Sequence, residues 1–404
     1  MTAKKNKSLA MLIIVAALGY FVDIYDLVVF NVVKKESMAA LGIPVEKEIF
    51  LFNMQMIGML IGGILWGILG DKKGRISVLF GSIFLYSAAN IANSFATGLV
   101  DYSIYRFLAG IGLAGELGAG ITLVAESMDK EKRGYGTMVI VTLGALGAVA
   151  ASLVGNNLGW KNTYLVGGGL GLALLLLRAG AFESGMYKSI ESSKVSRGSF
   201  IQLFTNKDRF LKYLNCILIG LPIWFAIGVL INLSNKFGEE IGVSEPVKVA
   251  DSVMYAYIGL SFGDLLSGLL SQVFRSRKKV VIGYLILSVI LLLIYLFNHN
   301  VSISYFYFFC FLLGTATGYW ALFVTIASEQ FGTNIRSTVT TTVPNFVRGA
   351  VVPITLSFTA LTPYVGVLYS ALIVGGVCLA LAFYAILNVK ETFSKDLDYV
   401  DEIS

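Results

Sequence analysis

The chain has 404 residues, of which 56% are hydrophobic and 14% are charged, and its mean hydropathy is +0.77. Soluble domains carry about 25% charged residues, so this composition excludes an ordinary soluble protein and indicates a chain that lies mostly in lipid. The formal net charge of +6 is not gathered in a solvated basic domain, so we expect no nucleic-acid partner.

Stretches of about 20 apolar residues, the length that crosses a bilayer as a helix, recur from Leu9 to Asn388. The predicted fold class is an all-α membrane protein with twelve transmembrane helices. The connections are too short to hold a soluble catalytic domain, so we do not expect an enzyme. In chain order the expected spans are 9–33, 49–70, 76–95, 101–124, 135–157, 162–182, 211–235, 250–273, 279–297, 302–326, 337–361 and 364–389.

Most of the 31 lysines and arginines fall on one side of this topology, before the first span, in the even-numbered connections and in the C-terminal tail. Cytoplasmic segments retain positive charge, so we expect a multi-pass protein of the inner (cytoplasmic) membrane with both termini in the cytoplasm. The three cysteines lie far apart in apolar stretches, which favours packing over a metal site or a disulfide. We expect no metal, no other cofactor and a monomer in the lipid bilayer.

The longest polar interval divides the spans six and six. It predicts an N-terminal six-helix bundle at 1–182, a cytoplasmic linker with an amphipathic segment at 183–210, and a C-terminal six-helix bundle with a cytoplasmic tail at 211–404. Basic residues alternate with apolar ones in the linker, a pattern that suits a segment lying on an anionic membrane surface.

The two halves also repeat one another weakly. Glu126 and Arg133 are seven residues apart, as are Glu329 and Arg336, and the two pairs are offset by 203 residues. A repeated pair at the same side of the membrane indicates duplication, so we expect two pseudo-symmetric bundles with a solute site between them.

The turn after the second span reads Gly67-Ile68-Leu69-Gly70-Asp71-Lys72-Lys73-Gly74-Arg75. Its glycines permit a tight turn between close helices, and Asp71 and Arg75 are able to form charge-assisted hydrogen bonds with neighbouring helix ends. This turn resembles the G-x-x-x-D-[RK]-x-G-R signature of the major facilitator superfamily, in the loop where that family carries it.

Further motifs extend the resemblance over nearly the whole chain. They are Arg106-x-x-x-Gly110-x-Gly112-x-x-Gly115-Glu116, Phe182-Glu183-Ser184 and Thr333-Asn334-Ile335-Arg336-Ser337-Thr338. Together they resemble the sugar-porter and metabolite:proton-symporter branches, although proline is missing before Glu183. The resemblance implies a cytoplasmic gate in which charged residues pair across the two halves: Asp71, Arg75, Glu126, Arg133, Glu183, Glu329 and Arg336.

Ionisable residues inside the spans cost at least about 2.5 kcal/mol each to insert, so each is a candidate for function. Asp23 and Asp26 lie three residues apart on one face of the first span, and with Glu116 they are the candidates for proton coupling. The family resemblance supports this prediction, because metabolite:proton symporters carry a similar pair. The alternative is a structural salt bridge to Arg106 or Arg348, which we expect to be the only cations deep in the apolar zone.

A guanidinium that faces a cavity binds a carboxylate with two hydrogen bonds, so an organic anion or an amino acid is a plausible substrate. Pro344 and Asn345 indicate a local break in the eleventh span that would line the cavity. The candidate substrate-binding residues are Arg106, Arg348, Tyr25, Asn345, Trp224, Tyr319, Trp320 and Gln55, with Asn31, Asn53 and Asn232 as further polar side chains in the spans.

The sequence therefore predicts a secondary active transporter that moves a small polar organic solute by alternating access, with protons as the coupling ion. No phosphate-binding loop for ATP is present, so the driving force is expected to be a gradient. A proton-coupled drug or metabolite exporter is the alternative function, and a non-transporting membrane sensor is a third.

Overall fold

The computed structural model describes residues 2–73, 75–118, 120, 128, 133–182, 200, 202–332 and 335–394. These residues form helices joined by short connections, with no strand among them. The helices are α1 (Thr2–Ala40), η1 (Val45–Lys47), α2 (Glu48–Lys73), α3 (Arg75–Asn93), α4 (Leu99–Leu113), α6 (Arg133–Phe182), α7 (Gln202–Thr205), α8 (Lys207–Phe225), the π-helix η3 (Ala226–Ile231), α9 (Ser234–Glu240), α10 (Val249–Val273), α11 (Arg277–Phe297), α12 (Ile303–Thr317), α13 (Trp320–Gln330), α14 (Arg336–Gly349) and α15 (Val351–Asn388).

Eight helical stretches of the described chain are long and apolar enough to cross a membrane. Two of them, Tyr135–Ala179 with 45 residues and Thr338–Asn388 with 51, are about twice the length that one crossing needs. The apolar α3 and the helix α4, which continues beyond a turn, account for the two remaining predicted spans. The twelve-helix prediction therefore fits the described residues.

The two double-length stretches reverse direction at a glycine. Gly159 in α6 has φ 75° and ψ 165°, and Gly366 in α15 has φ 80° and ψ 172°. This backbone region is essentially restricted to glycine. Gly159 lies in the interval 157–162 that the sequence leaves between two predicted spans, whereas Gly366 lies two residues beyond the start of the predicted span 364–389.

The outer surface of the helices is apolar, whereas charged side chains lie inside. Leu176, Val273 and Tyr364 are each more than 70% exposed. In contrast, Asp23, Arg106 and Arg348 are at most 2% exposed. Lipid is the solvent that suits this arrangement, because it stabilises apolar surface and leaves buried polar groups to pair with one another.

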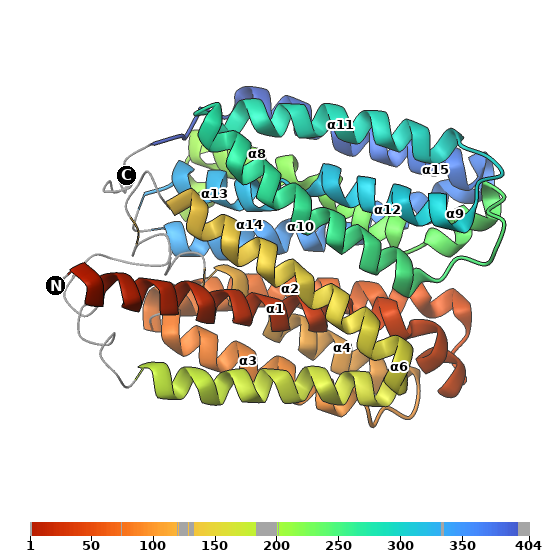
Figure 1. Cartoon of the computed structure of the whole chain (residues 1–404), viewed down its shortest axis with the longest axis horizontal. Coiled ribbons are helices and arrows are strands. Elements are labelled where there is room, and N and C mark those ends of the chain that lie inside the picture. Colours follow the sequence, from red (N-terminus) through yellow and green to blue (C-terminus); the bar gives the residue numbers. More distant parts are fainter. Residues whose placement is uncertain are drawn as a thin grey trace.

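The helices form two bundles that lie side by side (Figure 1). In the first, α1 packs against α6, and α2 and α3 pack against α4. In the second, α10 packs against α12, and α15 packs against α8 and α11. The bundles meet mainly where α2 contacts α14 and where α6 contacts α10, and the predicted architecture of two six-helix bundles is confirmed.

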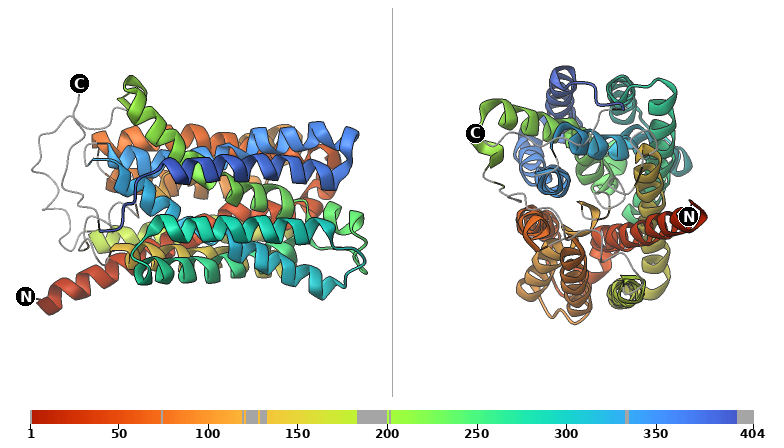
Figure 2. Two further views of the ribbon diagram at one scale, coloured as in Figure 1. Left: turned by 90° about the horizontal axis from the view of Figure 1, so that it is seen from above. Right: turned by 90° about the vertical axis from the view of Figure 1, so that its left-hand side faces the viewer.

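The first turns of α1 and the last turns of α15 lie at the same end of the molecule (Figure 2). We call this the termini end, and the opposite end, which carries η1 and α9, the far end (Figure 1). The predicted linker at 183–210 lies largely outside the described residues, so the boundaries 182/183 and 210/211 stay predictions.

Two helices that the sequence predicts as continuous are interrupted at equivalent places. A turn at Ala114 and Gly115 ends α4 before helix resumes at Glu116. Gly318 and Tyr319 separate α12 from α13 in the same way. The two glycines are offset by 203 residues, like the Glu/Arg pairs. Interrupted helices at matching positions of two repeats are typical of a central binding site.

The break predicted at Pro344 and Asn345 is wrong, since α14 continues through Pro344 to Gly349. The interruption falls at Ala350, where α14 gives way to α15 and the residue keeps helical dihedral angles (φ −63°, ψ −17°). Proline removes one backbone donor and crowds the preceding turn, but membrane helices tolerate it where neighbouring groups supply the missing bond.

The backbone at Gly366 allows a stability prediction. A methyl group there meets no atom within 4 Å, so Gly366→Ala isolates backbone strain and is expected to cost about 1–3 kcal/mol. Gly376, in helical conformation in the same element and equally free of neighbours, is the control, and Gly376→Ala is expected to be neutral or stabilising by up to about 1 kcal/mol. Thermal unfolding in detergent measures both; equal melting temperatures would contradict the assigned reversal.

Candidate functional site

An ion pair between the two bundles marks the centre of the molecule. Arg348 of α14 and Asp23 of α1 are both fully buried, and their Nη2 and Oδ2 atoms lie 3.7 Å apart. Nη1 of Arg348 donates a weak hydrogen bond of 3.4 Å to Asn345, but its Nε and Nη2 have no hydrogen-bond partner among the described residues. The pair is long, so the guanidinium retains donors for another anion.

Two tryptophans face this guanidinium. The Cζ atom of Arg348 lies 5.5 Å from the ring centre of Trp320 and 5.8 Å from that of Trp224, within the range of cation–π attraction. The two rings meet edge to face at 6.3 Å. Buried aromatic faces therefore surround the cation on one side.

A small apolar cavity lies beside the two tryptophans. Its wall combines large aromatic rings with aliphatic side chains from both bundles. The lining residues are Tyr20, Ile24, Ala145, Ile223, Trp224, Ile227, Tyr257, Leu260 and Trp320. The cavity is narrow in this arrangement, so a ligand larger than water requires the surrounding side chains to move apart.

Asn345 links this centre to the interrupted helix of the other bundle. Its Nδ2 donates to the carbonyl oxygen of Ala114 at 2.8 Å and to that of Thr341 at 2.7 Å, while Oδ1 accepts from Arg348. The Ala114 carbonyl is free because α4 ends there. The predicted substrate residue Asn345 thus connects the cation with the break in α4.

A second buried cation, Arg106 of α4, has a shell of neutral groups. Its Nε donates to the Leu51 carbonyl at 2.9 Å, Nη2 to Oε1 of Gln55 at 2.5 Å and Nη1 to the Tyr164 hydroxyl at 3.3 Å. The guanidinium also lies 3.7 Å above the ring of Phe30. Arg106 and Gln55 are therefore brought together as predicted, but they form a site separate from Arg348.

Asp26 lies one turn beyond Asp23 on α1 and is 1% exposed. Its carboxyl oxygens accept no hydrogen bond of good geometry, although the Asn90 side chain lies close to them. The oxygens of Asp23 also lack a hydrogen-bond donor among the described residues. A carboxylate without donors is costly to bury, so both side chains are suited to hold a proton.

Two predicted substrate residues have their polar atoms engaged elsewhere. The Tyr25 hydroxyl donates to the Thr163 carbonyl at 3.0 Å, and the Tyr319 hydroxyl donates to the Ile219 carbonyl at 3.0 Å. Neither residue lines the cavity beside Arg348. Both bonds join separate helices, which indicates a packing role.

The expectation that Arg106 and Arg348 are the only deeply placed cations is wrong. Arg178 of α6 is 1% exposed and forms a two-point ion pair with Glu116, at 2.5 and 2.9 Å. The sequence places Arg178 at the polar end of an apolar run, which concealed its burial. Glu116 therefore has a full counter-ion, while its predicted part in proton coupling stays a prediction.

The predicted cytoplasmic gate is only partly described. Glu126 and Glu183 lie outside the described residues, and for Asp71, Arg75, Arg133 and Arg336 the structure gives only the helical backbone. Glu329 is buried, and its oxygens accept from Nη2 and Nε of Arg277 at 3.1 and 3.2 Å. That partner belongs to the same half of the chain, so the pairing across the halves stays a prediction.

Contacts at the far end were not foreseen from the sequence. Lys34 of α1 is buried, pairs with Glu48 of α2, and donates to the Asn232 carbonyl at 2.6 Å and to its Oδ1 at 3.0 Å. Asn53 of α2 exchanges hydrogen bonds with Thr355 of α15 at 3.1 and 3.2 Å. These bonds join the two bundles at the far end, away from the Asp23–Arg348 pair.

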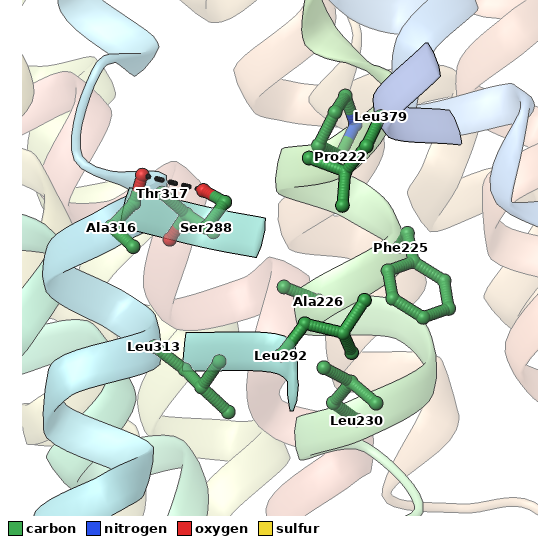
Figure 3. A pocket seen from close by; sticks show the side chains of 10 residues that line it. All are labelled: Pro222, Phe225, Ala226, Leu230, Ser288, Leu292, Leu313, Ala316, Thr317 and Leu379. Carbon is green, nitrogen blue, oxygen red and sulfur yellow. Dashed lines mark hydrogen bonds between the residues drawn. The ribbon is translucent and has the colours of Figure 1, made fainter. Parts of the chain in front are cut away.

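Another small apolar pocket lies wholly among residues of the second bundle (Figure 3). Its polar lining side chains are Ser288 and Thr317, whose hydroxyls donate to backbone carbonyls. No charged group faces it. We interpret it as a packing space next to the π-helix η3 and not as part of the polar site.

Comparison with known proteins agrees with this architecture. The sequence profile described as Major Facilitator Superfamily matches residues 16–354. The solved structure of the proton:xylose symporter XylE, bound to 6-bromo-6-deoxy-D-glucose, aligns with a TM-score of 0.72 over 98% of both chains at 16% identity. That similarity concerns the fold.

Two curated relatives align over parts of the chain. A protein named "Putative metabolite transport protein", from Haemophilus influenzae, is 28% identical over 256 residues, which are 60% of this chain and 63% of that one. The "Putative niacin/nicotinamide transporter NiaP" of Bacillus subtilis is 30% identical over 186 residues, 45% of this chain and 46% of that one. The matches thus span about half to three fifths of these relatives.

The fold and the apolar helices define a multi-pass membrane protein. The chain belongs to the Major Facilitator Superfamily.

The Glu116–Arg178 pair gives a prediction that separates its two possible roles. Glu116→Gln leaves a buried guanidinium without an anion and is expected to cost about 3–5 kcal/mol, which reduces the yield of folded protein. Glu116→Gln combined with Arg178→Met removes both charges and is expected to restore most of the yield. Size-exclusion chromatography and thermal unfolding measure this. A well-folded Glu116→Gln protein that no longer accumulates solute would instead support the coupling role.

Proposed function

We propose that the chain is a proton-coupled symporter of a small planar aromatic carboxylate. It acts in the inner membrane with both termini in the cytoplasm. The observation that carries the proposal is the Arg348 guanidinium, which has two unpartnered nitrogens, a weak ion pair to Asp23 and a cavity lined by Trp224 and Trp320 beside it.

The cavity supports the choice of substrate class. A planar ring packs between tryptophan and tyrosine faces, and its carboxylate forms two parallel hydrogen bonds with a guanidinium. A sugar would leave most of its hydroxyls unpaired against Ile223, Ile227 and Leu260, which is costly. One relative carries the name of a putative niacin/nicotinamide transporter; niacin is an aromatic monocarboxylate, whereas nicotinamide is its neutral amide.

The same geometry supports proton coupling. Asp23 and the substrate carboxylate compete for one guanidinium, so a proton on Asp23 releases Arg348 to bind the substrate. Loss of that proton returns Asp23 to Arg348 and expels the substrate anion. Asp26, without a cation partner among the described residues, supplies a second place for a proton close to the first.

The geometry also bears on the alternative functions. An exporter of lipophilic cations would place a positive charge beside the Arg348 guanidinium in a dry cavity, where like charges repel strongly. An importer of anions avoids this cost. The sensor alternative predicts binding without flux, and the uptake experiment below tests it directly.

The first test of the proposal is uptake of radiolabelled nicotinate or benzoate into proteoliposomes with an inwardly directed proton gradient. We expect accumulation in wild-type liposomes and none of benzamide, which lacks the carboxylate. Arg348→Lys keeps the charge but loses the paired donors, so the KM for the carboxylate is expected to rise about tenfold or more. Arg275→Lys, at an exposed position outside the spans, is the control. No uptake or binding of any aromatic carboxylate would contradict the proposal.

Substitution of the two aspartates tests how the proton is used. Asp23→Asn frees Arg348 permanently, so substrate affinity is expected to stay at its low-pH value as the pH rises, and gradient-driven accumulation is lost while exchange of substrate across the membrane persists. Asp26→Asn is also expected to abolish accumulation, but its affinity still falls as the pH rises because Asp23 still competes. Glu36→Gln, exposed on the same helix, is the control.

The measurements for this test are equilibrium binding between about pH 5 and pH 8 and counterflow in liposomes. Accumulation that survives in both aspartate variants would exclude this pair as the coupling site.

A further inference from the structure

Asp264 is a fully buried carboxylate in the middle of α10 that the functional arguments above do not use. Its Oδ1 accepts a hydrogen bond of 2.9 Å from the backbone N–H of Ala321, and the N–H of Trp320 is a second backbone donor to the carboxyl group. Both donors belong to the first turn of α13. Oδ2 has no hydrogen-bond partner among the described residues.

The break before α13 creates the need for this bond. The first N–H groups of a helix have no partner within the helix, and Tyr319, which precedes α13, forms no side-chain bond to them. In the middle of a membrane protein water does not satisfy such groups. A carboxylate at this place supplies the acceptor and also interacts favourably with the positive end of the helix dipole.

Close backbone contact allows α10 to reach the break. A methyl group on Gly318 would overlap the backbone of Gly263 and Asp264. The Tyr284 hydroxyl of α11 donates to the Gly263 carbonyl at 2.8 Å, which fixes this stretch of α10 from the other side. The Asp264 carboxyl group is therefore held rigidly against the start of α13.

The bond joins two walls of the aromatic cavity. Tyr257 and Leu260 of α10 line the cavity, and Asp264 lies one turn beyond Leu260. Trp320 of α13 lines it from the other side and packs against Arg348 and Trp224. A change at Asp264 is thus transmitted to the Trp320 indole through the backbone of Trp320 and of Ala321.

The break in the first bundle is satisfied differently. Nε1 of Trp66 donates to the Ile111 carbonyl at 2.6 Å, and Asn345 of the other bundle donates to the Ala114 carbonyl. Those bonds serve free carbonyls at the end of α4, and one of them crosses between the bundles. The Asp264 bond stays within one bundle, so it is able to persist while the bundles move.

We propose that Asp264 is a positioning residue for substrate recognition, which holds the first turn of α13 so that Trp320 forms a fixed aromatic wall beside Arg348. This inference takes its substrate class from the proposed function and rests on it. Asp264 acts through an accepted hydrogen bond and not through proton transfer, so an amide at the same place preserves the role.

The first test compares Asp264→Ala with Asp264→Asn in proteoliposomes. Asp264→Ala is expected to raise the KM for benzoate about tenfold, the effect of about one lost hydrogen bond to a charged group, with kcat within about twofold of wild type. Asp264→Asn keeps an oxygen acceptor and is expected to stay within about threefold of the wild-type KM, with an unchanged pH profile. An Asn variant as impaired as the Ala variant, or one with a shifted pH profile, would overturn the positioning role.

A double-mutant cycle tests whether the effect passes through Trp320. Trp320→Leu removes the indole, so adding Asp264→Ala to it is expected to raise the KM by no more than about twofold further. Additive effects of the two substitutions would overturn the inference. Thermal unfolding of each variant identifies any that fails to fold.

Hydrogen exchange tests the bond without any substrate. Peptides covering the start of α13 are expected to exchange faster in Asp264→Ala than in wild type, and at the wild-type rate in Asp264→Asn. Equal rates in all three proteins would overturn the inference even if uptake of aromatic carboxylates is found. Faster exchange in the Ala variant together with no aromatic carboxylate uptake by wild type would support the bond between Asp264 and the start of α13 and reject the proposed substrate.

Discussion

Buried charge is the constraint on which this structure depends. In a bilayer, lipid solvates the outer surface of each helix as well as another helix does, so the hydrophobic effect gives little preference for one helix arrangement over another. Charged and polar groups inside the bundle have no such freedom, since each needs a partner of suitable geometry. The contacts of Asp23 with Arg348, Glu116 with Arg178 and Glu329 with Arg277 therefore fix which helices lie together.

These pairs differ in a way that matters for function. Two pairs each join helices within their own half through two hydrogen bonds: Glu116 with Arg178 in the first half, and Glu329 with Arg277 in the second. They hold each bundle together. Asp23 with Arg348 joins the two halves through one long contact. Firm ion pairs within each half and a weak one between the halves fit the proposed function, in which the halves move as units around the substrate.

The sequence was sufficient for the fold because composition and spacing carry its main determinants. Apolar runs predicted the spans, and the repeated Glu/Arg spacing with the Gly67–Arg75 turn predicted the two bundles and the family. The sites were harder. Trp224, Trp320, Asn345 and Arg348 were predicted individually, but only the three-dimensional structure shows that they meet.

Asp264 lies in the middle of the predicted span 250–273, so the cost of burying a charge already marked it as a candidate, although the predicted site residues did not include it. Arg178 was missed for a physical reason. A lone charge near the end of an apolar run is indistinguishable from one at the membrane surface, and whether it is buried depends on the neighbouring helices. The breaks at Gly115 and Gly318 were hidden as well, since glycine in a membrane helix serves close packing as often as interruption. The offset of 203 residues between the two glycines is the signal that would have revealed them.

The bond from Asn345 to the Ala114 carbonyl has a consequence for how the bundles separate. It closes a gap in the backbone bonding of α4 with a donor from the opposite bundle. If the bundles part during the proposed transport, that carbonyl loses its donor, and water entering the widening space is able to replace it. Opening would therefore require water to enter the site, and closing would require that water to leave.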